Sequence, residues 1–307
     1  MSQVALDPTP RADPAEEQIL EVSSLVKRFG DLVAVDDVSF RLARARSMAI
    51  VGESGSGKTT VAKMIVGLER PTSGTIVACG RDRSRPARST ALRRARGREA
   101  QIVFQDPYTS LDPRQTVERT LDEVIRLHHQ PDAADRRERV RTLTELVGLD
   151  ARQARALPRD LSGGQRQRVA IARALAAEPR VLILDEAVAA LDVSIQAQVL
   201  NLLADIREET GVSYVLISHD LAVVRQISED TIVMREGKVV ERGPTAQVLD
   251  APQDPYTRLL RESVPRPGWR PVRRLSGAGT RTTGSGGPPP SPAGHASTNP
   301  ATSGGDR

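Results

Sequence analysis

The fold is decided by the stretch MAIVGESGSGKTT, residues 48–60. Its first four residues are an apolar run typical of a buried strand, which passes directly into a loop of the pattern G-x-x-x-x-G-K-[ST]. In such a loop the backbone N–H groups surround phosphate oxygens, Lys58 reaches the β- and γ-phosphates, and the Thr59 hydroxyl ligates Mg²⁺. The helix predicted over 59–68 directs its positive end at the same oxygens, which favours a nucleotide site over an ordinary glycine-rich turn. The residues predicted to contact the nucleotide are Gly52, Glu53, Ser54, Gly55, Ser56, Gly57, Lys58, Thr59 and Thr60.

A second stretch, VLILDE at 181–186, supplies the acids that nucleotide hydrolysis needs. An apolar strand that ends in Asp185 places a carboxylate where it can hold the Mg²⁺ shell. Glu186 follows at once and can orient or deprotonate the attacking water. Alone, such a run is weak evidence, since many buried strands end in acids. Together with the glycine-rich loop it predicts a P-loop nucleotide hydrolase, with Lys58 and Glu186 among its catalytic residues.

Short β-branched runs alternate with helical stretches around these two motifs. Strands are predicted over 19–26, 35–42, 48–51, 101–104, 181–184 and 213–218, helices over 165–177 and 193–209, and a hairpin over 230–235 and 238–242. Strands separated by helices imply an α/β fold with a parallel sheet and right-handed crossovers. The charged helical stretch 106–176 interrupts the pattern and is expected to form an inserted subdomain.

A third motif, LSGGQ at 161–165, opens the helix predicted over 165–177. A serine hydroxyl and glycine N–H groups at a helix start form another anion-binding surface. The chain already has one phosphate cradle, so a second one suggests that it serves a nucleotide held by a partner subunit. A simple helix cap is the alternative, because serine and glycine are common at that position.

These three motifs and their spacing resemble the ABC transporter ATPases. The resemblance implies a P-loop NTPase with a RecA-like core, antiparallel N-terminal strands and an inserted helical subdomain over about 106–176. It also implies that two such subunits enclose two ATP molecules, each between the P-loop of one subunit and the signature of the other. In this chain the signature residues are Ser162, Gly163, Gly164 and Gln165.

The resemblance also assigns single residues. Phe29 resembles the aromatic side chain that stacks on adenine, although a lone Phe is more often a core residue. Gln105 resembles the catalytic glutamine that contacts Mg²⁺ and links to the membrane partner, and His219 resembles the switch histidine that contacts the γ-phosphate. Asp192 resembles the D-loop aspartate, whereas Ala189 stands where the family commonly has a serine. The implied cofactors are ATP and Mg²⁺, with Thr59, Gln105 and Asp185 as metal ligands.

Further stretches narrow the resemblance to the oligopeptide/dipeptide importer ATPases. They are FQDPYTSLDPR at 104–114, DVSIQAQVLNLL at 192–203 and DPYTRLL at 254–260. The last implies a C-terminal extension over about 244–264, so that the ABC ATPase domain covers 18–264. Some members hold an iron–sulfur cluster near the C-terminus, which this chain cannot do because Cys79 is its single cysteine.

Composition excludes further classes of protein. The net charge of +5 lies in residues 265–307, so the rest is neutral and does not suggest a nucleic-acid binder. Aromatic residues make up 2%, too few for a stacking platform for single-stranded nucleic acid. The Pro- and Gly-rich stretch 265–307 and the polar stretch 1–17 are expected to be disordered. We find no secretory signal and no run of 18 apolar residues that would span a membrane.

The segment 81–98 holds eight arginines. It is predicted to be either a patch for nucleic acid or lipid phosphate or, preferably, a solvated connection.

We therefore expect an ATP-hydrolysing subunit that powers an importer of oligopeptides or dipeptides at the cytoplasmic face of the membrane. The expected partners are a paralogous ABC ATPase in a heterodimer, two permeases and, indirectly, an extracytoplasmic solute-binding protein, with no nucleic acid. The alternatives are a soluble ABC ATPase acting on nucleic acid or the ribosome, an importer of nickel, glutathione or sugars, an exporter, and a nucleotide sensor without turnover. The segment between Gln105 and Ser162 is too short for the coiled-coil arm that a soluble DNA-acting member would carry.

Overall fold

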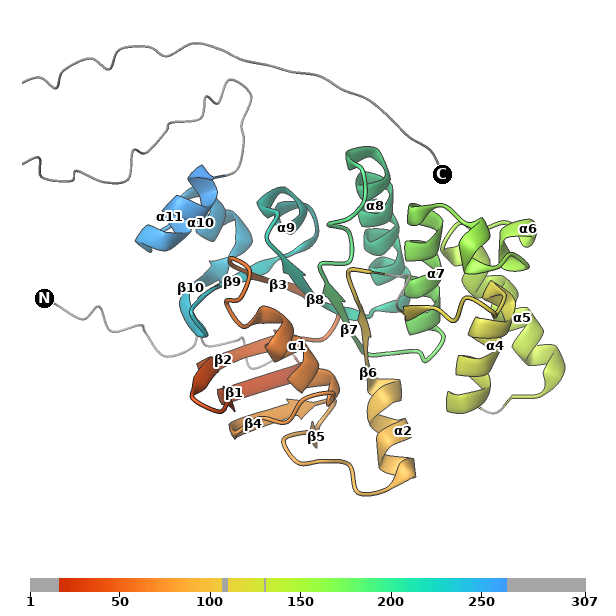
Figure 1. Ribbon diagram of the computed structural model, residues 1–307, viewed down its shortest axis with the longest axis horizontal. Coiled ribbons are helices and arrows are strands. Elements are labelled where there is room, and N and C mark those ends of the chain that lie inside the picture. Colours follow the sequence, from red (N-terminus) through yellow and green to blue (C-terminus); the bar gives the residue numbers. More distant parts are fainter. Residues whose placement is uncertain (1–16, 107–109, 130, 264–307) are drawn as a thin grey trace, which may run out of the picture. The chain divides into compact units, whose positions relative to one another are not determined.

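The computed structural model describes residues 17–106, 110–129 and 131–263, all within one compact unit. The stretches predicted to be disordered, 1–17 and 265–307, lie outside these ranges apart from Glu17. Figure 1 shows two sheets with helices between and beside them. No helix in the described ranges is long and apolar enough to cross a membrane.

The smaller sheet is antiparallel and has the strand order β2-β1-β4-β5. Its strands are β1 (Gln18–Phe29), β2 (Leu32–Ala43), β4 (Ser73–Ala78) and β5 (Arg81–Asp82). The predicted antiparallel N-terminal strands are therefore confirmed. The sequence prediction missed β4, because only Ile76 and Ala78 of its six residues are buried and its apolar pattern is correspondingly short.

The larger sheet has the order β10-β9-β3-β8-β7-β6. Its strands are β3 (Ser47–Val51), β6 (Ala100–Val103), β7 (Val181–Asp185), β8 (Ser213–Ser218), β9 (Asp230–Arg235) and β10 (Lys238–Pro244). All neighbours are parallel except the hairpin of β9 and β10. Val51 pairs with Ser218, and Asp185 pairs with Ile217. The carboxyl ends of β3, β8 and β7 therefore meet at one edge of the sheet.

Each central strand is buried on both faces, which explains its unbroken apolar run. In β3, Met48 and Ile50 face a core shared with the antiparallel sheet and helix α1 (Lys58–Val66). Ala49 and Val51 face a second core under seven further helices. These helices are α4 (Val117–His128), α5 (Ala133–Leu146), α7 (Gly163–Leu175), α8 (Val193–Thr210), α9 (Leu221–Ile227), α10 (Thr245–Asp250) and α11 (Pro255–Glu262). The short helix α6 (Ala151–Ala154) contacts α4.

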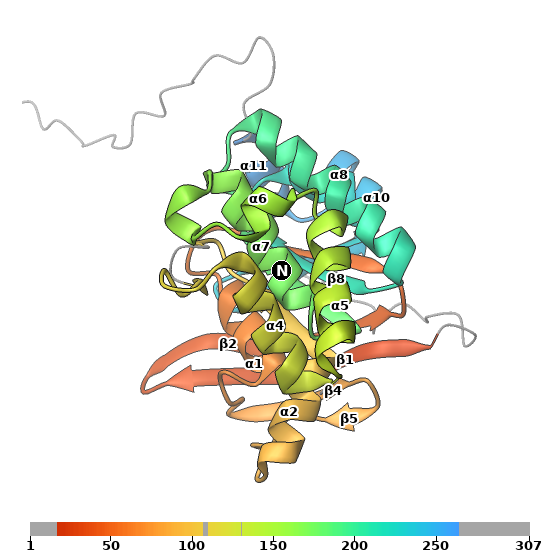
Figure 2. The same ribbon diagram turned by 90° about the vertical axis from the view of Figure 1, so that its right-hand side faces the viewer.

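The inserted helical subdomain is confirmed. Between β6 and β7 the described residues contain helices α4 to α7 and a 3₁₀ turn at Pro158–Asp160, with no strand. Figure 2 shows α4, α5 and α6 together on the side facing the viewer. In Figure 1 these helices lie to the right of the larger sheet, whereas the antiparallel sheet and α1 lie at its lower left.

The arginine-rich segment corrects one prediction. It is largely exposed, as a solvated connection would be, but it is not irregular, because it contains strand β5 and helix α2 (Thr90–Glu99), which is capped by the Ser89 hydroxyl. Arg83 is only 3% exposed, donates to Glu99 at 2.7 Å and also donates to the Arg96 carbonyl. The helix was not predicted because none of its residues is buried, so it has no apolar period.

Candidate nucleotide-binding site

The glycine-rich loop leaves β3 and enters α1 in a backbone conformation that only glycine accepts. Gly57 has φ of +100°, and a Cβ atom there would lie 2.4 Å from the Ala34 carbonyl oxygen. At Gly52, with φ of +152°, a Cβ atom would lie 2.2 Å from the Met234 carbonyl oxygen. The backbone at Ala34 and Met234 thus packs directly against the loop and holds it in place. The first turn of α1 presents its free N–H groups beside the loop.

Lys58 lies under the loop and is only 4% exposed. Its Nζ donates to the Gly52 and Glu53 carbonyls at 2.8 and 2.7 Å, and to the Ser56 hydroxyl at 3.4 Å. Burial lowers the pKa of Lys58, whereas the carboxylates of Glu186, Asp185 and Glu53 oppose that shift. The ammonium thus has one acceptor for each of its three protons. To contact a phosphate, it would have to give up at least one of these acceptors.

The predicted Mg²⁺ ligands Thr59 and Asp185 lie side by side. The Thr59 hydroxyl donates to Asp185 Oδ1 at 3.1 Å, although 126 residues separate them in sequence. Burial raises the pKa of Asp185, and the hydrogen bond from Thr59 opposes the shift. Hydroxyl and carboxylate oxygens at the start of a phosphate-binding helix are the donor set that Mg²⁺ accepts, so these two residues fit the ion. Gln105 is exposed beyond β6, and its part in the metal site stays a prediction.

Glu186 and His219 follow neighbouring strands, β7 and β8. The His219 Nδ1 atom lies 3.5 Å from Glu186 Oε1, and their side chains are 57% and 23% exposed respectively. Glu186 has a left-handed backbone, with φ of +50°, and its N–H donates to the Ile217 carbonyl at 2.9 Å. The structure therefore brings together a carboxylate and an imidazole at the same sheet edge as the P-loop.

The signature forms the start of α7. Ser162 and Gln165 make a capping box, in which the Ser162 hydroxyl accepts from the Gln165 N–H and the Gln165 side chain accepts from the Ser162 N–H. The structure therefore also fits the simple cap that was the alternative. A Cβ atom at Gly164 would lie 2.5 Å from Ile195 in the first turn of α8, and Asp192 caps that helix by accepting from the Ile195 N–H at 2.9 Å.

The site residues thus fall into two groups within one chain. The first comprises the P-loop, Asp185, Glu186 and His219 at the carboxyl edge of the sheet, and the second comprises the signature and Asp192 at the starts of α7 and α8. In the ranges that the structure describes, no hydrogen bond or ion pair joins the second group to the first.

Phe29 lies at the end of β1 and is 45% exposed, so it is not the core residue of the alternative interpretation. The Lys27 ammonium lies 4.5 Å from the centroid of its ring. The ring can therefore stack on a flat ligand on its other face, and adenine stacking stays a prediction.

Sequence reasoning missed the contacts that hold the P-loop from the C-terminal half of the chain. The Gly237 N–H in the hairpin of β9 and β10 donates to the Ser56 carbonyl at 3.1 Å, and the Glu53 N–H donates to the Tyr256 hydroxyl at 3.0 Å. The stretch that contains Tyr256 was recognised as a family extension. Nothing in its pattern indicates which part of the chain it contacts.

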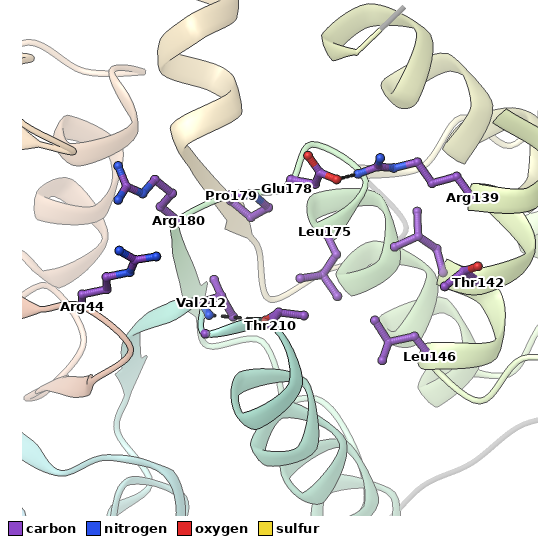
Figure 3. A pocket seen from close by; sticks show the side chains of 12 residues that line it. Arg44, Arg139, Thr142, Leu146, Leu175, Glu178, Pro179, Arg180, Thr210 and Val212 are labelled. Carbon is purple, nitrogen blue, oxygen red and sulfur yellow. Dashed lines mark hydrogen bonds and ion pairs between the residues drawn. The ribbon is translucent and has the colours of Figure 1, made fainter. Parts of the chain in front are cut away.

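A cavity of about 560 Å³ lies at the other end of the parallel strands. It is lined by Arg44, Arg180 and Val212, which precede β3, β7 and β8, and Figure 3 shows Leu146 and Leu175 across it. Its cations are paired, because Arg44 and Arg180 contact Glu17, and Arg139 contacts Glu178. The cavity is thus separate from the predicted nucleotide site.

Comparison with known protein families accords with this geometry. The profile of the ABC transporter family matches residues 35–189, which contain the P-loop, the signature and the Asp185-Glu186 pair. The chain belongs to the ABC transporter ATPase family. A second profile, for the oligopeptide/dipeptide transporter C-terminal region, matches residues 240–287 of this ABC ATPase. That match continues past residue 264, where the extension was predicted to end.

Individual relatives agree. The ABC ATPase is 44% identical over 265 residues to a putative peptide import ATP-binding protein of Brucella abortus, covering 83% of this chain and 79% of the relative. It is also 44% identical over 278 residues to the glutathione import ATP-binding protein GsiA of Escherichia coli, covering 84% of this chain but 44% of the longer relative.

A solved dimeric structure of the ATP-binding cassette MJ0796, bound to ADP and Pi, superposes with a TM-score of 0.66 at 29% identity, covering 74% of this chain and 98% of that one. The predicted P-loop NTPase fold and the resemblance to peptide-importer ATPases are confirmed, and this chain is an ATPase of the ABC type.

Proposed function

We propose that this ABC ATPase binds and hydrolyses ATP to power a membrane importer of oligopeptides, dipeptides or a similar small peptide such as glutathione. The observation that carries the proposal is the edge of the parallel sheet, where Lys58, the Thr59–Asp185 pair and the Glu186–His219 pair converge. The peptide class is supported by the match over residues 240–287 and by the names of the relatives.

Each residue has a role in this proposal. The P-loop N–H groups and Lys58 bind the phosphates, and Thr59 and Asp185 hold Mg²⁺, which when bound neutralises phosphate charge. Glu186 orients the attacking water and accepts its proton, and His219, 3.5 Å away, contacts both that carboxylate and the γ-phosphate. Gln105 is the proposed further ligand of Mg²⁺ and the link to the permease.

The separation of the two groups of site residues supports a dimer. Among the described residues, no hydrogen bond or ion pair joins the signature or Asp192 to the P-loop of their own chain, and we propose that both contact a nucleotide held by another subunit. The dimeric structure of the related cassette supports such an arrangement. We propose a heterodimer with a paralogous ATPase on two permeases at the cytoplasmic face of the membrane, served by a solute-binding protein.

No observation favours the alternative of a nucleic-acid enzyme. The arginines of the segment 81–98 are partly neutralised within the fold, because Arg81 and Arg83 pair with Glu99 and Arg98 pairs with Glu178. The segment is thus less cationic than its sequence suggests.

The test is uptake by the purified membrane complex in proteoliposomes. We expect ATP-dependent accumulation of a labelled dipeptide or oligopeptide, absent when this subunit carries Lys58→Ala. Glutathione in a parallel arm distinguishes the two peptide classes, and native mass spectrometry counts the ATPase subunits. ATP hydrolysis that no tested peptide stimulates would refute the peptide importer, and two copies of this chain with no second ATPase would refute the heterodimer.

A further inference from the structure

The described part of the C-terminal extension contacts the P-loop through the buried side chain of Tyr256. The Glu53 N–H, in the second residue of the loop, donates to the Tyr256 hydroxyl at 3.0 Å across 203 residues of sequence. Tyr256 is 5% exposed, and the Arg235 guanidinium lies 5.0 Å from the centroid of its ring. Its ring packs in the core under the helices, and this packing fixes the side chain and therefore the position of its hydroxyl.

Hydrogen bonds also fix the start of α11, the helix that carries Tyr256. Asp254 caps the helix by accepting from the Tyr256 N–H at 2.8 Å. Both carboxylate oxygens of Glu241, in β10, accept backbone N–H groups, from Gln253 at 2.8 Å and from Asp254 at 3.1 Å. Glu241 is 9% exposed, so these charge-assisted bonds are shielded from water. The position of the Tyr256 hydroxyl is therefore set by β10 of the larger sheet.

Glu53 is held on both sides of its backbone. Tyr256 accepts from its N–H, whereas the Lys58 ammonium donates to its carbonyl at 2.7 Å. The lysine must release at least one of its acceptors to reach a phosphate, since an ammonium has three protons. The tyrosine bond requires no such exchange. Together with the Gly237 N–H bond to the Ser56 carbonyl, it can keep the loop in place when the lysine moves.

The extension also contacts the helix that follows the predicted switch histidine. Asp250 in α10 pairs with Arg225 in α9 at 2.5 and 3.1 Å. Helix α9 begins at Leu221, two residues after His219. The pair is exposed and contributes little stability. The extension thus contacts the P-loop through Tyr256 and helix α9 through Asp250.

We propose that Tyr256 is a positioning residue of the nucleotide site, and that docking of the C-terminal extension sets the affinity of the P-loop for ATP. This inference rests on the nucleotide site proposed above. The tyrosine fixes the Glu53 peptide so that the following N–H groups stay aligned for phosphate. Without the hydroxyl, Glu53 loses its N–H partner and the loop has to reorganise before it binds.

The test compares two buried tyrosines. Tyr256→Phe removes the hydroxyl that holds the P-loop, and Tyr214→Phe removes a buried hydroxyl that donates to the Leu203 carbonyl at 2.8 Å, in the same core. ATP binding to the full-length chain is measured by calorimetry with Mg²⁺, and Tm is measured without nucleotide. We expect Tyr256→Phe to weaken ATP binding about 5-fold, the equivalent of one hydrogen bond, and Tyr214→Phe to lower Tm while leaving the Kd for ATP unchanged.

Two further variants separate the possible failures. Glu241→Gln weakens the hydrogen bonds that hold the start of α11 but leaves Tyr256 unchanged. It should also weaken ATP binding, so it provides a test if Tyr256→Phe does not fold. Lys58→Ala tests the site itself. Loss of binding in Lys58→Ala with wild-type affinity in Tyr256→Phe would overturn the positioning role alone, whereas wild-type affinity in Lys58→Ala would overturn the proposed site. Equal weakening by Tyr214→Phe would show that the effect is general destabilisation.

Discussion

Replacing Glu186 by Gln should separate ATP binding from ATP hydrolysis. The change is isosteric, and the backbone that carries the side chain is fixed independently of the carboxylate. The Glu186 N–H donates to the Ile217 carbonyl at 2.9 Å, and its own carbonyl accepts from the Ala189 N–H at 3.0 Å. We therefore expect the variant to fold with the same left-handed turn after β7.

The expected magnitude follows from the chemistry of the site. Loss of a positioned general base lowers the rate about 10²- to 10⁴-fold, which raises the activation free energy by roughly 3–5 kcal/mol. Binding should not suffer. Glu186 is the first of three carboxylates whose charges act on Lys58, so its neutralisation reduces the repulsion that a polyphosphate meets there. ATP affinity is expected to stay equal or to rise.

The assay is steady-state release of phosphate by the assembled transporter, together with a titration of ATP binding. Glu236→Gln is the matched control, because Glu236 has the same left-handed backbone, with φ of +48°, but an 83% exposed side chain. It should hydrolyse ATP at about the wild-type rate. Hydrolysis by Glu186→Gln within a few-fold of that control would refute the role of Glu186 as the base.

Three further outcomes are expected. Lys58→Ala should weaken ATP binding roughly 10- to 100-fold in a nucleotide titration, because it removes a charge-assisted contact to the phosphates, and unchanged affinity would contradict this role. Gly57→Ala should cost about 1–3 kcal/mol, seen as a lower Tm, because a Cβ atom meets the Ala34 carbonyl at 2.4 Å. Gly67→Ala, also at positive φ but with nothing within 4 Å, should cost less, and equal losses would show that the contact is unimportant. Asp185→Asn should raise the Tm of the nucleotide-free protein at pH 7. Burial raises the pKa of Asp185, so the stability linked to this group is present below its unfolded pKa and is lost as the pH rises through the folded value. The same variant should lose the Mg²⁺-dependent rise in Tm on adding ATP, and retention of that rise would argue against Asp185 as a ligand.

The sequence by itself determined the parts of this protein whose chemistry is local. A phosphate-binding loop needs glycines, a lysine and a hydroxyl close together in sequence, so residues 52–60 can be recognised as such a loop without a structure. The same holds for Asp185 and Glu186 at the end of an apolar strand. The parallel sheet followed from buried strands that alternate with helices, because a strand covered on both faces must be apolar throughout.

The helix at 90–99 shows where such reasoning fails. It buries none of its own residues and is held near the sheet by polar contacts, including the bond from the buried Arg83 to Glu99. An arginine-rich stretch in sequence gives no sign of which carboxylate it meets, since salt bridges carry no period. The sequence therefore favoured a solvated connection, and only the folded chain revealed an ordered helix.

Only the tertiary structure decided which of the recognised residues meet. The register of β7 on β8 brings His219 within 3.5 Å of Glu186, and the packing of α11 brings Tyr256 to the Glu53 N–H. In the described ranges it also left the signature without a hydrogen bond or ion pair to the P-loop of its own chain. These contacts depend on strand order and strand register, which no local sequence pattern encodes. A slip of one residue in the register would move each side chain of a strand to the opposite face of the sheet.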